Sequence, residues 1–325
     1  MKYENVIINS EGKRSAGILM HVSSLPGKYG IGTLGQEAYR FVDFLKSAGV
    51  HYWQVLPLVQ TGFGDSPYQS VCCTSGNPYF IDPDSLAAEG LLTKAELKEA
   101  VLPQGEVDYA AVYNTRYPVL RKAFARFDRE DKDFKAFVRE GKFRSYAEYM
   151  TVKQAFSNRC FVEWDREFRL NDREMVEAFI RENYDEYLFW NWLQFEFRRQ
   201  WFALKKYANK SGVYIIGDIP LYVAYDSSDV WANPELFQLD ENRAMKEVAG
   251  VPPDYFSEDG QLWGNPLYDW TEQEKDGYAW WISRLRDALE IFDVIRLDHF
   301  RGLDRYYAIP NGRKDARVGE WRDGP

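Results

Sequence analysis

The stretch VIRLDHFRG, residues 294–302, decides the fold class. It begins with aliphatic residues, as a buried strand does, and a strand that is covered on both faces is a nearly continuous apolar run. Arg296 and Asp298 interrupt this run, and they share one face because side chains alternate along a strand. In a parallel barrel the functional site lies at the C-terminal ends of the strands. We therefore expect Arg296 and Asp298 at such an end, pointing into a site.

Three other apolar runs also end in polar residues. GILMHV at 17–22 is followed by SSLPG, YWQVLPLV occupies 52–59, and VYIIGDIPLYV at 213–223 carries Asp218 near its end. A helical pattern over 36–48 separates the first two runs, and strand, helix, strand is the unit of a parallel sheet. The sequence therefore predicts an α/β fold in which at least four parallel strands present polar groups at the same edge.

The order of strands and helices is interrupted in the middle of the chain. Residues 61–184 show loops and helical patterns without a core strand, which indicates an inserted, mainly helical subdomain. We expect residues 1–60 to supply strands 1 and 2, and residues 185–325 to supply strands 3 and 4 with long loops. The aromatic helix expected over 185–208 should be buried. The Pro- and Gly-rich segment 250–269 shows no regular pattern.

Composition and charge exclude several classes of protein. The 325 residues carry a net charge of −9, whereas a nucleic-acid binder needs a basic face. No stretch approaches the roughly 20 apolar residues of a membrane helix. Three cysteines, with Cys72 and Cys73 adjacent, do not make a disulfide framework, so we expect a cytoplasmic protein. The chain has three histidines and no HExxH, CxxC or glycine-rich phosphate motif, so we expect neither a metal nor a cofactor.

The aromatic content is high, with 11 Trp, 22 Tyr and 21 Phe. A well-packed core explains most of these residues. Tyr and Trp also combine an apolar body with a polar tip, which suits the apolar faces and hydroxyl rims of sugars. Composition alone leaves both interpretations open.

The polar residues at the strand ends suit a polyhydroxylated ligand. An arginine close to a carboxylate favours the ionised form, and an ionised carboxylate can act as a nucleophile. From Arg296 and Asp298 alone, an ion pair that closes the end of a barrel is an equally good interpretation. Asp218 on a neighbouring strand end, and the loop GDSPYQS at 64–70, which presents Ser66 among other polar residues, favour the functional interpretation.

The segment RLDHFRG, residues 296–302, resembles the nucleophile strand of the α-amylase clan. More specifically, it resembles that of the amylomaltases, also called 4-alpha-glucanotransferases or disproportionating enzymes, of glycoside hydrolase family 77. Other motifs of that family occur in its order, from near residue 15 to the last residue: DSPYQS, GNPYFIDP, IGDIP, DVWANPELF, VAGVPPDYFS, GQLWGNP, LDHFRG and EWRDGP. Each motif is moderately specific, and the ordered set is very specific.

This resemblance implies a (β/α)8 barrel and a retaining mechanism on α-1,4-glucans such as maltodextrins. It implies that Asp298 is the catalytic nucleophile and that Arg296 keeps Asp298 ionised and oriented. Positions that match the donor-sugar subsite are Ser66, Tyr68, Asp218 and His299. Positions that match the family's loop over the acceptor side are Tyr255, Phe256, Gln261 and Trp263. An acceptor held on these aromatic residues would have a high effective concentration, so the sugar would be transferred rather than lost to water.

The match to the family leaves two parts unassigned. Its general acid, a glutamate at the end of the next strand, has no counterpart among these residues, and Glu320 matches the EWRDGP-like stretch instead. We count four barrel strands, whereas a closed barrel has eight. We therefore expect the N-terminal part of an amylomaltase, inactive on its own. A non-catalytic glucan-binding fragment and a hydrolase of the same clan are the alternatives, and the VAGVPPDYFS loop argues against the hydrolase.

Overall fold

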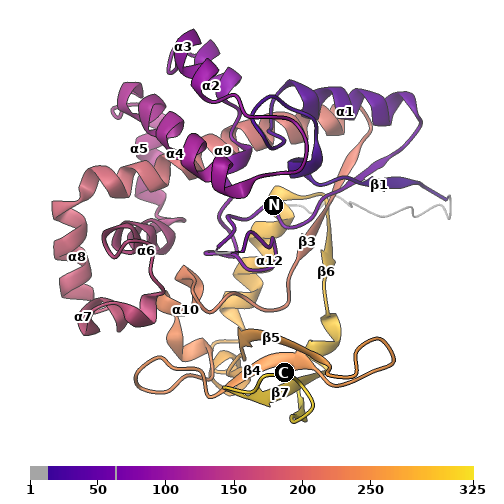
Figure 1. The fold of residues 1–325 in the computed structure, drawn as a ribbon, viewed down its shortest axis with the longest axis vertical. Helices are drawn as coiled ribbons and strands as arrows, with labels where there is room; N and C mark the ends of the chain where they lie inside the picture. Colours follow the sequence, from indigo (N-terminus) through magenta and orange to yellow (C-terminus); the bar gives the residue numbers. More distant parts are fainter. Residues whose placement is uncertain (1–13, 63) are drawn as a thin grey trace.

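A four-stranded parallel sheet lies on the right-hand side of the molecule in the view of Figure 1. The computed structural model describes residues 14–62 and 64–325. The strands lie in the order β1 (Gly17–Leu19), β2 (Tyr52–Gln54), β3 (Tyr214–Ile219) and β6 (Val294–Leu297), and each pair of neighbours is parallel. These are the four strands that the sequence predicts, and their order along the sheet follows their order along the chain.

The register between β3 and β6 brings the two charged strand ends together. Asp218 is paired with Arg296, and the neighbouring Gly217 is paired with Ile295. Gly217 has no side chain to obstruct Phe292, whose ring would lie 2.0 Å from a Cβ atom at this position. A larger residue here would push the start of β6 away from β3.

Long helices connect the strands and pack against the sheet. They are α1 (Gln36–Ser47), α9 (Tyr184–Lys210) and α12 (Ala279–Ile291); α9 and α12 contact β3, and α1 contacts α9. The predicted burial of the aromatic helix is confirmed, because Trp192 and Trp201 of α9 are fully buried. The short helices in this part of the chain are η1 (Val22–Ser24), α10 (Ser228–Ala232), η4 (Pro234–Leu236), α11 (Trp270–Glu274) and η5 (Phe300–Leu303).

Helices between β2 and β3 form a layer that packs around α9 (Figure 1). They are η2 (Pro78–Phe80), α2 (Pro83–Ala88), α3 (Lys94–Glu99), α4 (Tyr109–Arg126), α5 (Lys132–Glu140), α6 (Arg144–Ala155), η3 (Phe161–Glu163), α7 (Arg166–Arg169) and α8 (Arg173–Glu182). The described residues of 61–184 form no extended strand, only isolated bridges. The division of the chain at residues 60 and 184 stays a prediction.

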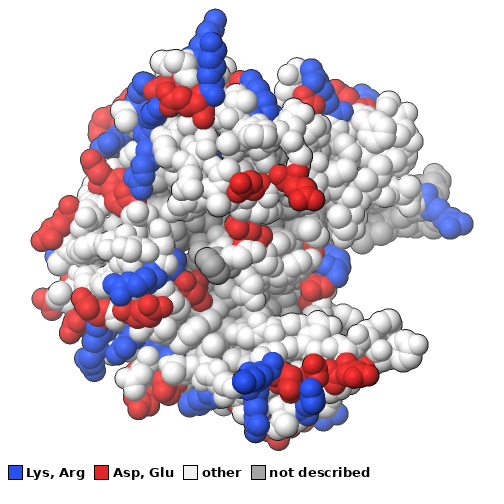
Figure 2. Space-filling model, in the orientation of Figure 1, with Lys and Arg blue, Asp and Glu red and all other residues white. Residues whose placement is uncertain are grey.

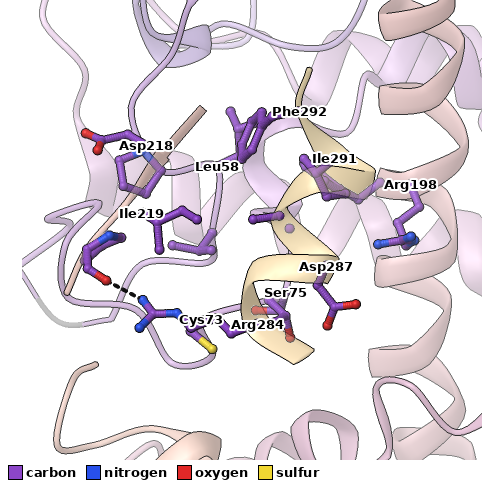
Figure 3. Close-up of a pocket in the computed structure, with 17 residues that line it drawn as sticks. Leu58, Cys73, Ser75, Arg198, Asp218, Ile219, Arg284, Asp287, Ile291 and Phe292 are labelled. Atoms are coloured by element: carbon purple, nitrogen blue, oxygen red, sulfur yellow. Dashed lines mark hydrogen bonds between the residues drawn. The ribbon is translucent and has the colours of Figure 1, made fainter. Parts of the chain in front are cut away.

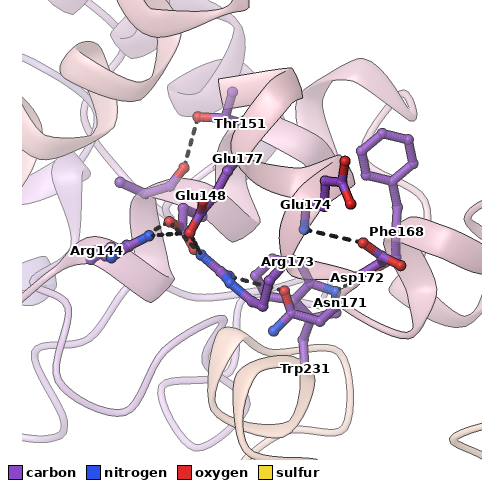
Figure 4. A network of polar contacts seen from close by, with 11 residues as sticks. Arg144, Glu148, Thr151, Phe168, Asn171, Asp172, Arg173, Glu174, Glu177 and Trp231 are labelled. Atoms are coloured by element: carbon purple, nitrogen blue, oxygen red, sulfur yellow. Dashed lines mark hydrogen bonds and ion pairs between the residues drawn. The ribbon is translucent and has the colours of Figure 1, made fainter. Parts of the chain in front are cut away.

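A buried carboxylate joins α6 to α8 within this layer (Figure 4). Glu148 of α6 accepts hydrogen bonds from Arg144 Nε at 2.7 Å and from Arg173 Nη1 at 2.8 Å. Both arginines also approach Glu177 of α8, at 3.0 Å and 3.5 Å. Because Glu148 is buried and its two partners are half exposed, this network fixes α8 against the layer at the protein surface.

A second, antiparallel sheet lies at one end of the molecule and was not predicted (Figure 1). Its strands lie in the order β5 (Gln261–Pro266), β4 (Glu247–Val251), β7 (Arg305–Pro310) and β8 (Glu320–Asp323). The expectation that 250–269 is irregular is therefore wrong for the residues of β4 and β5, whereas 252–260 is a loop. The alternation of apolar and polar residues that marks a strand is not visible here, because the β4–β5 pairing changes register between Val248 and Gly250 and because the strands contain glycine and proline.

The surface carries charges of both signs (Figure 2). In the same view the molecule is hollowed between the helical body and the antiparallel sheet. None of the helices in the described part of the chain is both long and apolar enough to cross a bilayer.

Candidate active site

Arg296 joins two carboxylates at the ends of β3 and β6. Its Nη1 atom lies 2.8 Å from both carboxylate oxygens of Asp218, and its Nη2 atom donates to Asp298 Oδ1 at 2.5 Å. The β3–β6 register places Asp218 opposite Arg296, and Asp298 follows two residues later on the same face. The sequence thus predicted the proximity of Arg296 and Asp298 correctly, and the structure adds Asp218 to the pair.

Tyr68 reaches this group from the loop that follows β2. Its hydroxyl donates to Asp218 Oδ2 at 2.6 Å. Ser66 supports the loop rather than the carboxylates, because its Oγ atom accepts a 3.3 Å hydrogen bond from the Tyr68 amide. Gln69 ties the same loop to β5 through a 3.3 Å hydrogen bond to Asn265. Asn265 was missed by the sequence analysis, since nothing in GNP marks an asparagine that anchors a distant loop.

Burial raises the pKa values of Asp218 and Tyr68, which meet at the end of β3. Asp218 is 3% exposed, and burial raises its pKa, although the hydrogen bond from Tyr68 and the charge of Arg296 act in the opposite direction. Burial and the bond to Asp218 raise the pKa of Tyr68 to about 12. Tyr68 therefore remains a protonated hydrogen-bond donor at neutral pH.

His299 and Trp263 form an adjoining part of the site. Their ring centroids are 4.7 Å apart and the rings are perpendicular. Burial lowers the pKa of His299, so its imidazole is neutral at neutral pH. Its Nε2 atom is buried and has no hydrogen-bond partner among the described residues. Trp263 in turn donates to Gln261 Oε1 at 3.1 Å. Three of the predicted residues are thus in one cluster next to Asp298.

Tyr255 and Phe256 stand apart from these groups. They lie on the loop between β4 and β5, which projects beyond the antiparallel sheet (Figure 1). Tyr255 is 98% exposed and Phe256 is 90% exposed, and their rings contact each other edge to face at 5.6 Å. Two large aromatic residues in solvent offer a surface on which the apolar face of a ligand can stack.

Arg284 of α12 holds the segment that follows Asp218 (Figure 3). Its buried guanidinium donates to the carbonyl oxygens of Pro220 at 2.6 Å and Leu221 at 3.0 Å, and Tyr268 donates to Leu221 at 2.8 Å. Asp218 and Arg284 border a small cavity of about 50 Å³. Nothing in the sequence marks this support, because Arg284 lies in an amphipathic helix where an arginine normally faces solvent.

No group of three or more His, Cys, Asp or Glu side chains within 14–62 and 64–325 has the arrangement of a metal site. The strand ends bring together a carboxylate beside an arginine, a second carboxylate, a tyrosine, a neutral histidine and nearby aromatic rings. This set can bind hydroxyl groups and stabilise a developing positive charge.

Known proteins with similar sequences are 4-alpha-glucanotransferases. The 4-alpha-glucanotransferase of Streptococcus pneumoniae is 48% identical over 320 residues, which cover 96% of this chain and 63% of that protein. The enzyme of that name from Clostridium butyricum is 46% identical over 312 residues, which cover 94% of this chain and 64% of that protein. The chain thus spans somewhat less than two thirds of the length of these relatives.

Solved structures give the same picture. An amylomaltase from Streptococcus agalactiae in complex with acarbose superimposes with a TM-score of 0.92 at 42% identity, over 96% of this chain and 65% of that one. An amylomaltase from Corynebacterium glutamicum, at 19% identity and a TM-score of 0.77, shares the fold. A sequence profile of the family described as 4-alpha-glucanotransferase matches residues 20–325. The chain therefore belongs to the 4-alpha-glucanotransferase family, glycoside hydrolase family 77.

Proposed function

We propose that this chain carries the donor and acceptor sites of a 4-alpha-glucanotransferase, which moves α-1,4-glucan segments between maltodextrins. The observation that carries the proposal is the contact series from Tyr68 through Asp218 and Arg296 to Asp298 at the strand ends. Family membership and the acarbose bound to the S. agalactiae relative support a glucan ligand. Neither a hydrolase nor a non-catalytic glucan-binding fragment is favoured by a specific observation.

The proposed reaction retains the configuration of the sugar. Asp298 attacks the anomeric carbon, the bond from that carbon to the leaving oxygen breaks, the leaving oxygen takes up a proton from a general acid, and a glycosyl ester forms on Asp298. The 4-hydroxyl of an acceptor glucan then displaces Asp298, returns its proton to that acid and re-forms an α-1,4 bond. The contact of Arg296 with Asp298 at 2.5 Å supports its role in orienting the carboxylate for attack.

The donor sugar would lie against Tyr68, Asp218 and His299. Asp218 can accept hydrogen bonds from sugar hydroxyls, and the unpartnered Nε2 atom of His299 can bond to another. Ser66 keeps the Tyr68 loop in place, so its proposed contribution to donor binding is indirect. Among these groups His299 Nε2 is the buried atom without a partner in the described structure, so a sugar hydroxyl would satisfy it.

The acceptor would lie over Trp263, Gln261 and the loop that carries Tyr255 and Phe256. Aromatic rings that hold an acceptor raise its effective concentration at the glycosyl ester, and a covered site excludes water. Gln261 and Trp263 lie on β5, with Trp263 against His299, and Tyr255 and Phe256 lie on the loop that precedes β5, which supports an acceptor surface made of this strand and this loop.

We further propose that the parallel sheet is part of a (β/α)8 barrel and that residues 61–184 form a helical subdomain beside it. No residue among 1–325 is assigned as the general acid. General acid catalysis typically contributes about 10²–10⁴-fold, so residues 1–325 prepared alone should show no glucan transfer. A cytoplasmic location remains a prediction, supported by the three free cysteines.

Maltotriose tests the proposed function. The full-length protein that carries these residues should release glucose and form longer maltodextrins from maltotriose, with few new reducing ends. Asp298→Asn should abolish both products and leave maltotriose binding largely intact, because the amide keeps the shape but cannot form the ester. An Asp298→Asn variant with activity near that of the wild type would refute the assignment.

A further inference from the structure

The loop with Tyr255 and Phe256 is fastened at its base to a segment that joins β7 to β8. The amide of Ala316 donates to the carbonyl of Asp259 at 2.9 Å. Arg317 Nε donates to Asp259 Oδ1 at 2.8 Å, and its Nη2 atom lies 2.5 Å from the same oxygen. A residue at the end of the β4–β5 loop is thus held by the backbone and by the side chain of a distant segment.

The contact is close-packed as well as charged. Ala316 is fully buried, and Tyr307 of β7 donates to its carbonyl at 3.2 Å, which fixes the segment on the antiparallel sheet. Gly260 has a φ of +68°, and a Cβ atom there would lie 2.5 Å from the Val251 carbonyl and 2.8 Å from Ala316 Cβ. Only glycine allows the loop base to approach Ala316 so closely.

The loop itself has internal order. Asp254 Oδ1 accepts hydrogen bonds from the amides of Phe256 at 2.8 Å and Ser257 at 2.9 Å. Ser257 Oγ donates to the Gly260 carbonyl at 2.7 Å. The rings of Tyr255 and Phe256 are almost fully exposed, so packing of the rings cannot set their position. The backbone of the loop sets it, and the backbone is anchored at Asp259.

We propose that Asp259 and Arg317 are positioning residues that hold the β4–β5 loop in the geometry that receives the acceptor glucan. This inference rests on the proposed function of that loop. A surface that is already ordered before the ligand arrives loses less conformational entropy on binding. Loosening the anchor should therefore weaken acceptor capture while the carboxylates at the strand ends stay unchanged.

The test compares Arg317→Ala with Arg313→Ala in the full-length protein. Arg313 lies in the same exposed segment, and the structure shows no ion pair for it within the described residues. For Arg317→Ala we expect the ratio of transfer to hydrolysis to fall about two- to fivefold, the range over which an exposed ion pair can shift an equilibrium. The KM for the acceptor should rise by a similar factor, and total donor cleavage should stay within twofold. Arg313→Ala should resemble the wild type.

Two further measurements keep the inference falsifiable. The swapped variant Asp259→Arg with Arg317→Asp should restore part of the lost ratio, because it re-forms the pair. Hydrogen exchange at the amides of Phe256 and Ser257 should be faster in Arg317→Ala than in Arg313→Ala, and this readout needs no activity. A wild-type protein without transfer would refute the proposed function. Equal exchange in the two variants, or an unchanged transfer ratio in an active enzyme, would refute the anchor.

Discussion

Removing Arg296 tests how much this arginine stabilises the fold by neutralising the buried carboxylate of Asp218. In the variant Arg296→Leu, Asp218 loses two contacts at 2.8 Å and Asp298 loses its partner at 2.5 Å. Asp218 keeps only the hydrogen bond from Tyr68 among its side-chain partners in the described structure. A buried carboxylate that loses its cation pays the cost of its desolvation, so the variant should unfold more easily than the wild type.

The size of this effect follows from the contacts. A hydrogen bond to a charged group contributes about 1.5–3 kcal/mol. Arg296 is 46% exposed on its side chain, so solvent screens part of its charge, whereas the Asp218 side chain is fully buried. We therefore expect the free energy of unfolding to fall by about 1.5–3 kcal/mol at neutral pH. Adding Asp218→Asn should recover about 1 kcal/mol of this loss, since an amide needs no counter-charge.

The effect should depend on pH in a definite direction. Burial already raises the pKa of Asp218, and Arg296 is one of the groups that oppose this rise. Without Arg296 the folded pKa moves further above the unfolded value of about 3.9. The folded state then binds more protons than the unfolded state, so stability is lost as pH rises through the folded pKa. The difference between variant and wild type should be small near pH 4 and grow toward pH 7.

Urea unfolding of the full-length protein at several pH values measures this difference. The matched control is Arg305→Leu, whose ion pair with Asp323 is exposed and should contribute little. A difference in unfolding free energy below about 0.5 kcal/mol at pH 7, or one that does not change between pH 4 and pH 7, would show that Arg296 does not stabilise the buried carboxylate.

Three other outcomes follow from the structure. The double variant Tyr255→Ala with Phe256→Ala should shift products from transfer to hydrolysis, because acceptor stacking is lost while the nucleophile is untouched; an unchanged ratio of new reducing ends to total cleavage would contradict this role. Glu148→Gln should lower the unfolding free energy by about 1.5–3 kcal/mol, since the buried carboxylate accepts from two arginines. Glu177→Gln, at a half-exposed position, should have a clearly smaller effect, and equal losses would argue against the buried carboxylate as the main support.

The four strands of the parallel sheet and the proximity of Arg296 to Asp298 could be predicted from the sequence. These strands are apolar runs that end in charged or polar residues, and their pairing puts Asp218 opposite Arg296. Alternation along a strand then predicts that Arg296 and Asp298 share a face, as they do. These features are local or follow from a simple repeat, so a pattern in the sequence can reveal them.

The antiparallel sheet and the supports of the site could not be predicted in this way. Strands β4 and β5 contain glycines and a proline, which lower β-propensity, and tertiary pairing overrides this preference. Three supporting residues contact segments that are far away in the sequence. Arg284 holds the segment after Asp218, Asn265 holds the loop with Tyr68, and Arg317 holds the loop with Tyr255. Such contacts depend on how whole loops are placed, and no spacing in the chain marks them.

Trapping the glycosyl ester tests the central claim, that Asp298 is the nucleophile of a retaining transferase. The full-length protein would be incubated with 5-fluoro-α-maltosyl fluoride, whose anomeric fluoride leaves without a general acid and whose ring fluorine slows breakdown of the ester. Mass spectrometry of the digested protein should find the sugar on the peptide that contains residues 294–302, at Asp298. Asp298→Asn should not be labelled. Labelling at Asp218 or at any other carboxylate, or no labelling of an enzyme that is active on maltotriose, would contradict the account.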